Sequence, residues 1–134
     1  MNNYMMSFLK NIFSNNKKTT KFPGVVVGKI MTVESHPNAD RLQITTVDVG
    51  KILKVVCGAP NIAIGQLVPV AVVGAVLPNG MVIQQASIRG VESEGMICAE
   101  DELGLGHEHF GVVILPYGKV GDPIDEYINI NNKN

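Results

Sequence analysis

The sequence contains no tryptophan, and aromatic residues make up only 5% of the chain. None of them lies between Pro23 and His109, the stretch that holds most of the β-branched segments. Barrels that bind single-stranded nucleic acid rely on aromatic side chains, because base stacking supplies much of their affinity. The sequence therefore disfavours a single-strand stacking mode and leaves recognition of a folded shape through backbone, hydroxyl and loop contacts.

Charged residues are also scarce, at 17% of the chain, and the formal net charge is −1. Nucleic-acid-binding domains are more often basic. The charge is uneven, since residues 1–21 carry four lysines and no acidic residue, whereas residues 22–134 carry seven basic and twelve acidic residues. If the globular part binds nucleic acid, it does so through a local basic patch, with weak and salt-sensitive affinity.

Only two cysteines are present, Cys57 and Cys98, each within an apolar run. We expect buried, reduced thiols, with a disulfide as the alternative. No apolar run approaches the roughly 20 residues of a membrane-spanning helix, and residues 1–13 lack the charge placement and cleavage site of a signal peptide. The cytoplasm is therefore the expected location, and no membrane partner is expected.

Short β-branched and alternating runs dominate the chain after residue 22. Glycine and proline turns separate them at intervals of about 8–15 residues, a pattern typical of a small all-β barrel. We predict a five-stranded OB-fold barrel, the oligonucleotide/oligosaccharide-binding barrel, in preference to a meander or a sandwich. The expected strands are residues 25–33, 42–49, 52–57, 68–73 and 81–88, with a return strand at 112–115.

Helix is expected only in short peripheral segments and in the N-terminal tail. Residues 4–13 carry apolar side chains at helical spacing, which predicts an amphipathic helix. Residues 100–103, ended by Gly104, and residues 123–128 are expected to form short helical turns. The expected organisation is a tail at residues 1–22, the barrel domain at 23–129 and a disordered tail at 130–134.

Residues 89–103 join an Arg-Gly pair, a Ser-x-Gly-Met turn and an acidic segment. The Ser93 hydroxyl is a candidate partner for a phosphate or ribose, and Gly95 lets another backbone approach closely. Met96 has a flexible thioether that can lie flat on a base or sugar. A tight turn that places Met96 in the core is the alternative, and from the residues alone it is the better one.

Four basic residues are further candidates for phosphate contacts. Arg89 can grip a phosphate with two hydrogen bonds, although an ion pair with Glu92 or Glu94 would explain it equally well. For each of the others a solvated surface charge is the simpler explanation. They are Lys29, Arg41 and Lys54.

No catalytic, metal or cofactor site is predicted. His107 and His109 lack a nearby third ligand, and side chains that alternate along a loop point apart, so zinc is not expected. Glu100 and Glu102 suit the start of a helix better than acid–base chemistry. The chain is therefore not expected to be an enzyme by itself.

Several short motifs, in order and at matching spacing, resemble a known family. The resemblance is to the tRNA-binding domain near the N-terminus of bacterial phenylalanyl-tRNA synthetase beta subunits, which also occurs in stand-alone tRNA-binding proteins. It covers roughly residues 24–128. The motifs are Val26-Val27-Gly28-Lys29, His36-Pro37-Asn38-Ala39-Asp40-Arg41-Leu42, Val56-Cys57-Gly58-Ala59-Pro60-Asn61 and Ile88-Arg89-Gly90-Val91-Glu92-Ser93-Glu94-Gly95-Met96-Ile97-Cys98.

The resemblance implies the barrel fold, tRNA as the partner, and tRNA contact at Ser93 and Met96. It also implies a non-catalytic domain of phenylalanine–tRNA ligase, or an accessory to it, with the ligase subunits as further partners. A short Lys/Asn-rich tail precedes the domain and the chain stops at Asn134, so either an excised domain or a stand-alone relative is expected. The alternatives are a structural or protein-interaction domain with little tRNA contact, and a homodimeric tRNA chaperone.

Overall fold

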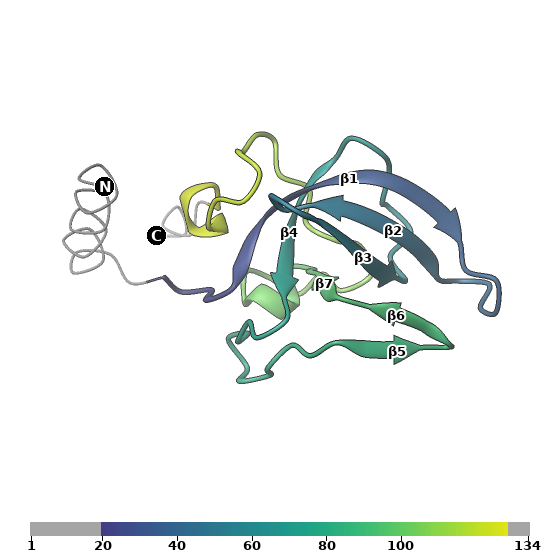
Figure 1. Ribbon diagram of the computed structural model, residues 1–134. Helices are drawn as coiled ribbons and strands as arrows, with labels where there is room; N and C mark the ends of the chain where they lie inside the picture. The colour runs from purple at the N-terminus through teal and green to yellow at the C-terminus, as the bar shows by residue number, and fades with distance from the viewer. Residues whose placement is uncertain (1–19, 129–134) are drawn as a thin grey trace, which may run out of the picture.

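The computed structural model describes residues 20–128, and its architecture is all-β, as predicted (Figure 1). In this part of the chain the only helices are two single turns of 3-10 helix, at the two segments predicted to be helical, and neither is long and apolar enough to span a membrane. The helix predicted at residues 4–13 and the tail at 130–134 lie outside the described residues. The elements are β1 (Val25–Ser35), β2 (Gln43–Asp48), β3 (Ile52–Cys57), β4 (Leu67–Val72), β5 (Ala86–Ile88), β6 (Val91–Ser93), β7 (Gly95–Ile97), η1 (Asp101–Leu103) and η2 (Ile124–Glu126).

Five strands form one antiparallel sheet in the order β3-β2-β1-β4-β7. The longest strand, β1, pairs with both β2 and β4, and its register against β2 shifts between Ile30 and Thr32. Such a bulge bends a strand and increases its twist. The sheet curls until β3 contacts β6 and β7, as the arch of β1 to β3 in Figure 1 shows. The predicted five-stranded barrel is confirmed.

The turn between β6 and β7 closes the barrel against β3. The Val56 N–H donates to Ser93 Oγ at 3.0 Å, and the Lys54 N–H donates to Glu94 Oε1 at 2.7 Å. The Lys54 carbonyl accepts the Glu94 N–H at 2.8 Å. An open sheet edge would leave these backbone groups of β3 without protein partners. Two side chains therefore take part in a closure that strands usually make with backbone alone.

The strand predicted at residues 81–88 is correct only at its end. β5 holds its last three residues and pairs with β6 alone, in a separate two-stranded sheet that turns at Arg89 and Gly90. Residues 81–85 instead fold back on the preceding turn, where Val76 and Val82 form an isolated bridge. The β5–β6 hairpin stands beside the barrel, so residues 81–85 have no strand of the barrel to pair with.

The return strand predicted at residues 112–115 is wrong. Val112 bridges to Ala99 and Leu115 bridges to Leu67, and neither bridge extends into a ladder. Residues of one short segment thus pair with two different parts of the chain. Val112 and Leu115 are buried, whereas Ile114 between them is exposed, so the segment fills gaps in the core rather than extending a sheet.

Two hydrophobic clusters share β1, which is buried on both faces near its start. One face carries Val25 and Val27 and is covered by the C-terminal segment around Ile124. The other face lines the barrel interior, where a Cβ added to Gly28 would lie 2.6 Å from Val70 Cγ2. Packing at native density leaves no room for that atom. The interior cluster consists of Ile30, Val47, Leu53, Val55, Cys57, Ile62, Val68, Val70, Ile97 and Val112.

Candidate nucleic-acid interface

Ser93, the first candidate contact, is buried, with 2% of its surface exposed. Its hydroxyl accepts the Val56 N–H and donates to the Gly95 carbonyl at 3.1 Å. The hydroxyl therefore both accepts and donates a hydrogen bond inside the protein. In this conformation Ser93 shapes the turn and joins β6 to β3.

Gly95 follows with a backbone φ of 154°, in a region that side chains rarely adopt. A Cβ at this position would lie 2.8 Å from the Ala71 carbonyl oxygen of β4. The close approach that glycine permits here is made by a neighbouring strand, which pairs Gly95 with Val72. Glycine is thus required by the fold at the start of β7.

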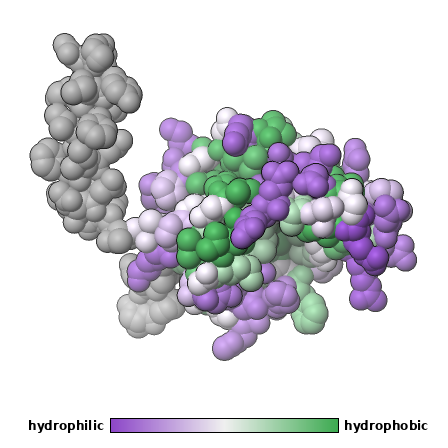
Figure 2. Space-filling view, turned by 60° about the horizontal axis from the view of Figure 1, so that its bottom comes forward, coloured by the Kyte–Doolittle hydropathy of each residue, from purple (hydrophilic) through white to green (hydrophobic). Residues whose placement is uncertain are grey.

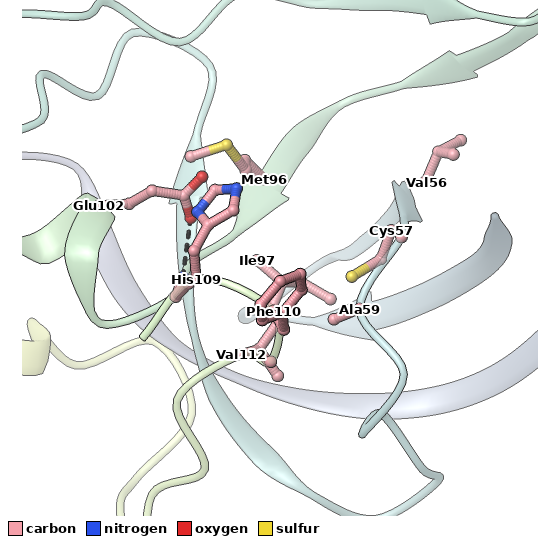
Figure 3. A pocket seen from close by; sticks show the side chains of 12 residues that line it. Val56, Cys57, Ala59, Met96, Ile97, Glu102, His109, Phe110 and Val112 are labelled. Atoms are coloured by element: carbon pink, nitrogen blue, oxygen red, sulfur yellow. Dashed lines mark hydrogen bonds between the residues drawn. The ribbon is translucent and has the colours of Figure 1, made fainter. Parts of the chain in front are cut away.

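Met96 is half-buried and lines a hollow of about 340 Å³ over the seam between β3 and β7. Figure 3 shows Met96, Glu102 and His109 along one side of this hollow, with the ring of Phe110 and Ala59 facing across it. The alternative that places Met96 in the core is therefore half right. The side chain packs against the hydrophobic cluster that contains Val25, Val27 and Ile124, and it also faces the hollow.

Phe110 was not among the residues predicted for the site. Its ring is 81% exposed. It forms a wall of the first hollow and also of a second one, of about 440 Å³, that Arg41 lines. Gly58 and Ala59 belong to both hollows as well. The two hollows therefore adjoin each other on either side of the exposed Phe110 ring, and together they are called the groove.

The motif at residues 36–42 forms the loop between β1 and β2 and holds the rim of the barrel. The Asn38 N–H donates to His36 Nδ1 at 2.9 Å, so the proton is on Nε2, which donates to the Ile88 carbonyl at 3.0 Å. The Asn38 side chain also reaches the Arg89 carbonyl, at 3.5 Å. These bonds place Arg41, on the same loop, at the same end of the molecule as Arg89. Figure 2 shows strongly hydrophilic residues gathered at this end, on the right of the view.

The cations of the region are available for a ligand. Within residues 20–128 the only ion pair joins His109 to Asp101. Glu92 instead accepts a hydrogen bond from Gln85, at 3.0 Å. The ion pair considered for Arg89 is thus not formed, and its side chain is exposed, with φ 51° at the tip of the β5–β6 hairpin.

Most of the predicted residues lie on or next to the β5–β6 hairpin. Lys54 bonds through its backbone with Glu94, next to Ser93, and the Asn38 side chain joins the loop that carries Arg41 to the Arg89 carbonyl. Lys29 stands apart from this group, because its cross-strand neighbours on β1 are Asp48 and Leu67.

His109 is held by the Asp101 carboxylate, with Nδ1 and Oδ1 3.0 Å apart. That hydrogen bond, and then the charge of the carboxylate, raise the pKa of His109 above 6.5. Glu102 accepts the Ala99 N–H at 2.8 Å, as expected for a carboxylate at a helix start. No group of three metal-binding side chains occurs among the residues that the structure describes.

Residues 25–122 match the family model described as "Putative tRNA binding domain". The chain belongs to this family. Among curated relatives of this tRNA-binding domain, the phenylalanine–tRNA ligase beta subunit of Nitratidesulfovibrio vulgaris is 55% identical over 94 residues, which are 69% of this chain and 12% of that protein. The same subunit of Bacteroides thetaiotaomicron is 49% identical over 115 residues, 81% of this chain and 14% of that protein. The chain thus corresponds to a small part of these ligase subunits.

Solved structures agree with the fold at lower identity. The C-terminal domain of Plasmodium vivax p43 has a TM-score of 0.53 and 23% identity, and covers 78% of this chain and 59% of that one. The MetRS related protein from Pyrococcus horikoshii has a TM-score of 0.54 and 21% identity, and covers 76% of this chain and 88% of that one. At these identities the likeness supports the barrel architecture alone.

Proposed function

We propose that this chain is a non-catalytic tRNA-binding module that docks on folded tRNA by shape and backbone contacts and supports phenylalanyl-tRNA aminoacylation. The observation that carries the proposal is its membership of the tRNA-binding domain family, together with the names of its curated relatives, which are phenylalanine–tRNA ligase beta subunits. Its role is as part of such a ligase or as an accessory to it.

The proposed contact surface is the end of the barrel around the β6–β7 turn. Met96 lies against a sugar or base, and the exposed cations Arg89, Arg41 and Lys54 contact phosphates. Lys29 is a more distant phosphate contact. Ser93 and Gly95 act on tRNA through the turn that they hold in shape.

A weak module of this kind works by effective concentration. Once a ligase holds tRNA at another site, the second contact becomes intramolecular, and overall affinity rises without any new chemistry. The small number of cations and the acidic surplus of residues 22–134 keep the affinity of the module alone modest.

Filter binding with a tRNA transcript and an unstructured RNA of the same length tests the proposal. Retention of tRNA is expected to exceed that of the unstructured RNA and to fall with added salt. Met96→Ala is expected to weaken tRNA retention severalfold, whereas Met81→Ala, at an exposed methionine outside the surface, leaves it unchanged. Equal retention of the two RNAs would refute shape recognition, and equal behaviour of the two variants would refute the site.

The acidic surplus of residues 22–134 favours a second candidate, a structural or protein-interaction domain of the ligase with little tRNA contact. A folded chain, verified by circular dichroism, that shifts no tRNA at low salt would establish this alternative. Light scattering on the same sample would show whether the chain forms the homodimer that a stand-alone tRNA chaperone requires.

A further inference from the structure

We propose that the groove divided by Phe110 holds one unpaired nucleotide of the bound RNA, with its base stacked on the Phe110 ring. The proposal rests on the proposed function for the identity of the partner, and adds a site for an unstacked base to the shape recognition described above. Stacking was disfavoured from the sequence because no aromatic residue lies on the strands, but Phe110 follows them and returns to the seam of the barrel.

Phe110 has the properties of a preformed stacking surface. Its ring is 81% exposed, yet the backbone beside it is held firmly, since Asn61 bonds with both the N–H and the carbonyl of Val112 at 2.9 and 3.0 Å. The Phe110 N–H also donates to Glu108 Oε2 at 3.0 Å. An aromatic ring on an ordered backbone loses little entropy when a base stacks on it.

The hollow on one side of Phe110 suits a base in size and in chemistry. Its volume is about 340 Å³, and Ala59 and Met96 contribute apolar surface to its lining. Glu102 directs its carboxylate into this hollow, as Figure 3 shows, because one oxygen is held by the Ala99 N–H. Among the described residues no hydrogen bond engages its second oxygen. That oxygen can accept an exocyclic amine of adenine, cytosine or guanine, which uracil lacks.

The two hollows differ in charge, and this orients the nucleotide. His109 also lines the first hollow, but its Nδ1 is held by the Asp101 carboxylate, so the Glu102 carboxylate still disfavours a phosphate there. Arg41 lines the second hollow and can bind a phosphate. Asp40 lines the second hollow too, so the attraction there is partly cancelled. Stacking on Phe110 must therefore contribute more to binding than charge does.

Nuclear magnetic resonance of the full chain with the four 5′-ribonucleoside monophosphates tests the site directly. AMP, CMP and GMP are expected to shift the Met96 methyl and Phe110 ring signals more than UMP does. Glu102→Gln is expected to reduce the difference between UMP and the other three monophosphates, because a neutral amide oxygen accepts a hydrogen bond from an amine less strongly than a carboxylate does. If no monophosphate moves these signals, or if UMP moves them most, the proposal is wrong.

Affinity for a tRNA transcript gives the second readout. Phe110→Ala is expected to weaken binding about five- to a hundredfold, the range of one lost base stack, and Phe110→Leu by nearly as much, since it keeps apolar volume without an aromatic face. Tyr117→Ala, at another exposed ring packed on Tyr127, is the matched control and should bind like the unmodified chain.

The outcomes separate this inference from the proposed function. Unchanged tRNA affinity in Phe110→Ala would overturn the stacking site and leave tRNA binding intact. Absence of tRNA binding by the unmodified chain, with the monophosphate shifts still present, would overturn the proposed function and retain a nucleotide site.

Discussion

At the scale of single residues, Ser93 links the apparent contact motif to the stability of the barrel. Its hydroxyl was predicted to face a ligand, but it lies at the seam between β3 and β6 and is bonded there on both sides. A short polar side chain two residues before a glycine suits such a seam. Its hydroxyl accepts the N–H of a strand residue that has no backbone partner, and it adds little bulk. The Ser-x-Gly-Met motif therefore combines scaffold residues with one residue, Met96, that borders the groove.

Ser93→Ala is expected to lower the free energy of unfolding by about 1–3 kcal/mol, because the buried Val56 N–H loses its acceptor. Urea denaturation followed by circular dichroism measures the change. Ser87→Ala, at an exposed position of β5, is the control and should change it by less than about 0.5 kcal/mol. Equal effects of the two substitutions would contradict the structural role of Ser93.

Both cysteines are free and buried, as predicted. Burial raises the pKa of Cys57, and it raises that of Cys98 to about 12. Because the thiolate is the reactive form, Ellman's reagent at pH 8 should label the cysteines of the folded chain slowly, and Cys98 more slowly than Cys57. In urea, where the chain is unfolded, both thiols should react rapidly. Rapid labelling of Cys98 in the folded chain would show that this part of the core opens readily.

The His109–Asp101 pair should make stability depend weakly on pH. The pKa of His109 is higher in the folded chain than its usual 6.5. The pair therefore stabilises the fold fully below that usual value, and the contribution is lost as pH rises through the folded pKa. In an NMR titration Asp101→Asn should move the His109 pKa back toward 6.5, whereas Glu100→Gln should change it little. An unchanged pKa in Asp101→Asn would contradict the pair.

At the scale of elements, β7 depends on how closely it can approach β4. The sequence indicated a glycine that permits close approach, but not which partner makes the approach. The Ala71 carbonyl occupies that space in the fold. The same limitation explains the wrong strand at residues 112–115, since an apolar run indicates burial without showing whether a neighbouring strand is there to pair with.

Gly95→Ala is expected to destabilise the chain by about 1–3 kcal/mol more than Gly74→Ala does, as measured by urea denaturation. Both glycines have positive φ angles, but an added Cβ would meet backbone 2.8 Å away at Gly95 and nothing within 4 Å at Gly74. The comparison isolates the contact with β4 from the backbone strain that both substitutions share. Equal losses would mean that strain alone requires glycine at Gly95.

At the scale of the whole molecule, charge is divided between the lysine-bearing N-terminal residues and the acidic remainder. If both parts contact RNA, the N-terminal lysines contribute to the salt dependence of binding. A chain that begins at residue 20 lacks three of the four lysines of residues 1–21, and the slope of log affinity against log salt should become shallower by up to about 2–3. Titration of a tRNA transcript at several salt concentrations measures this slope. An unchanged slope would assign the phosphate contacts to the barrel alone.

The order of β-branched runs and glycine turns was enough to predict an all-β barrel, because these signals are local and recur along the chain. The family was indicated instead by the resemblance of several short motifs, in order and at matching spacing. Only the tertiary structure decided how the barrel closes, since Ser93 reaches Val56 across 37 positions of sequence. It also decided that Phe110, outside every strand, stands between Met96 and Arg41. Periodicity shows which residues face the core, but which distant side chains meet depends on strand order and closure.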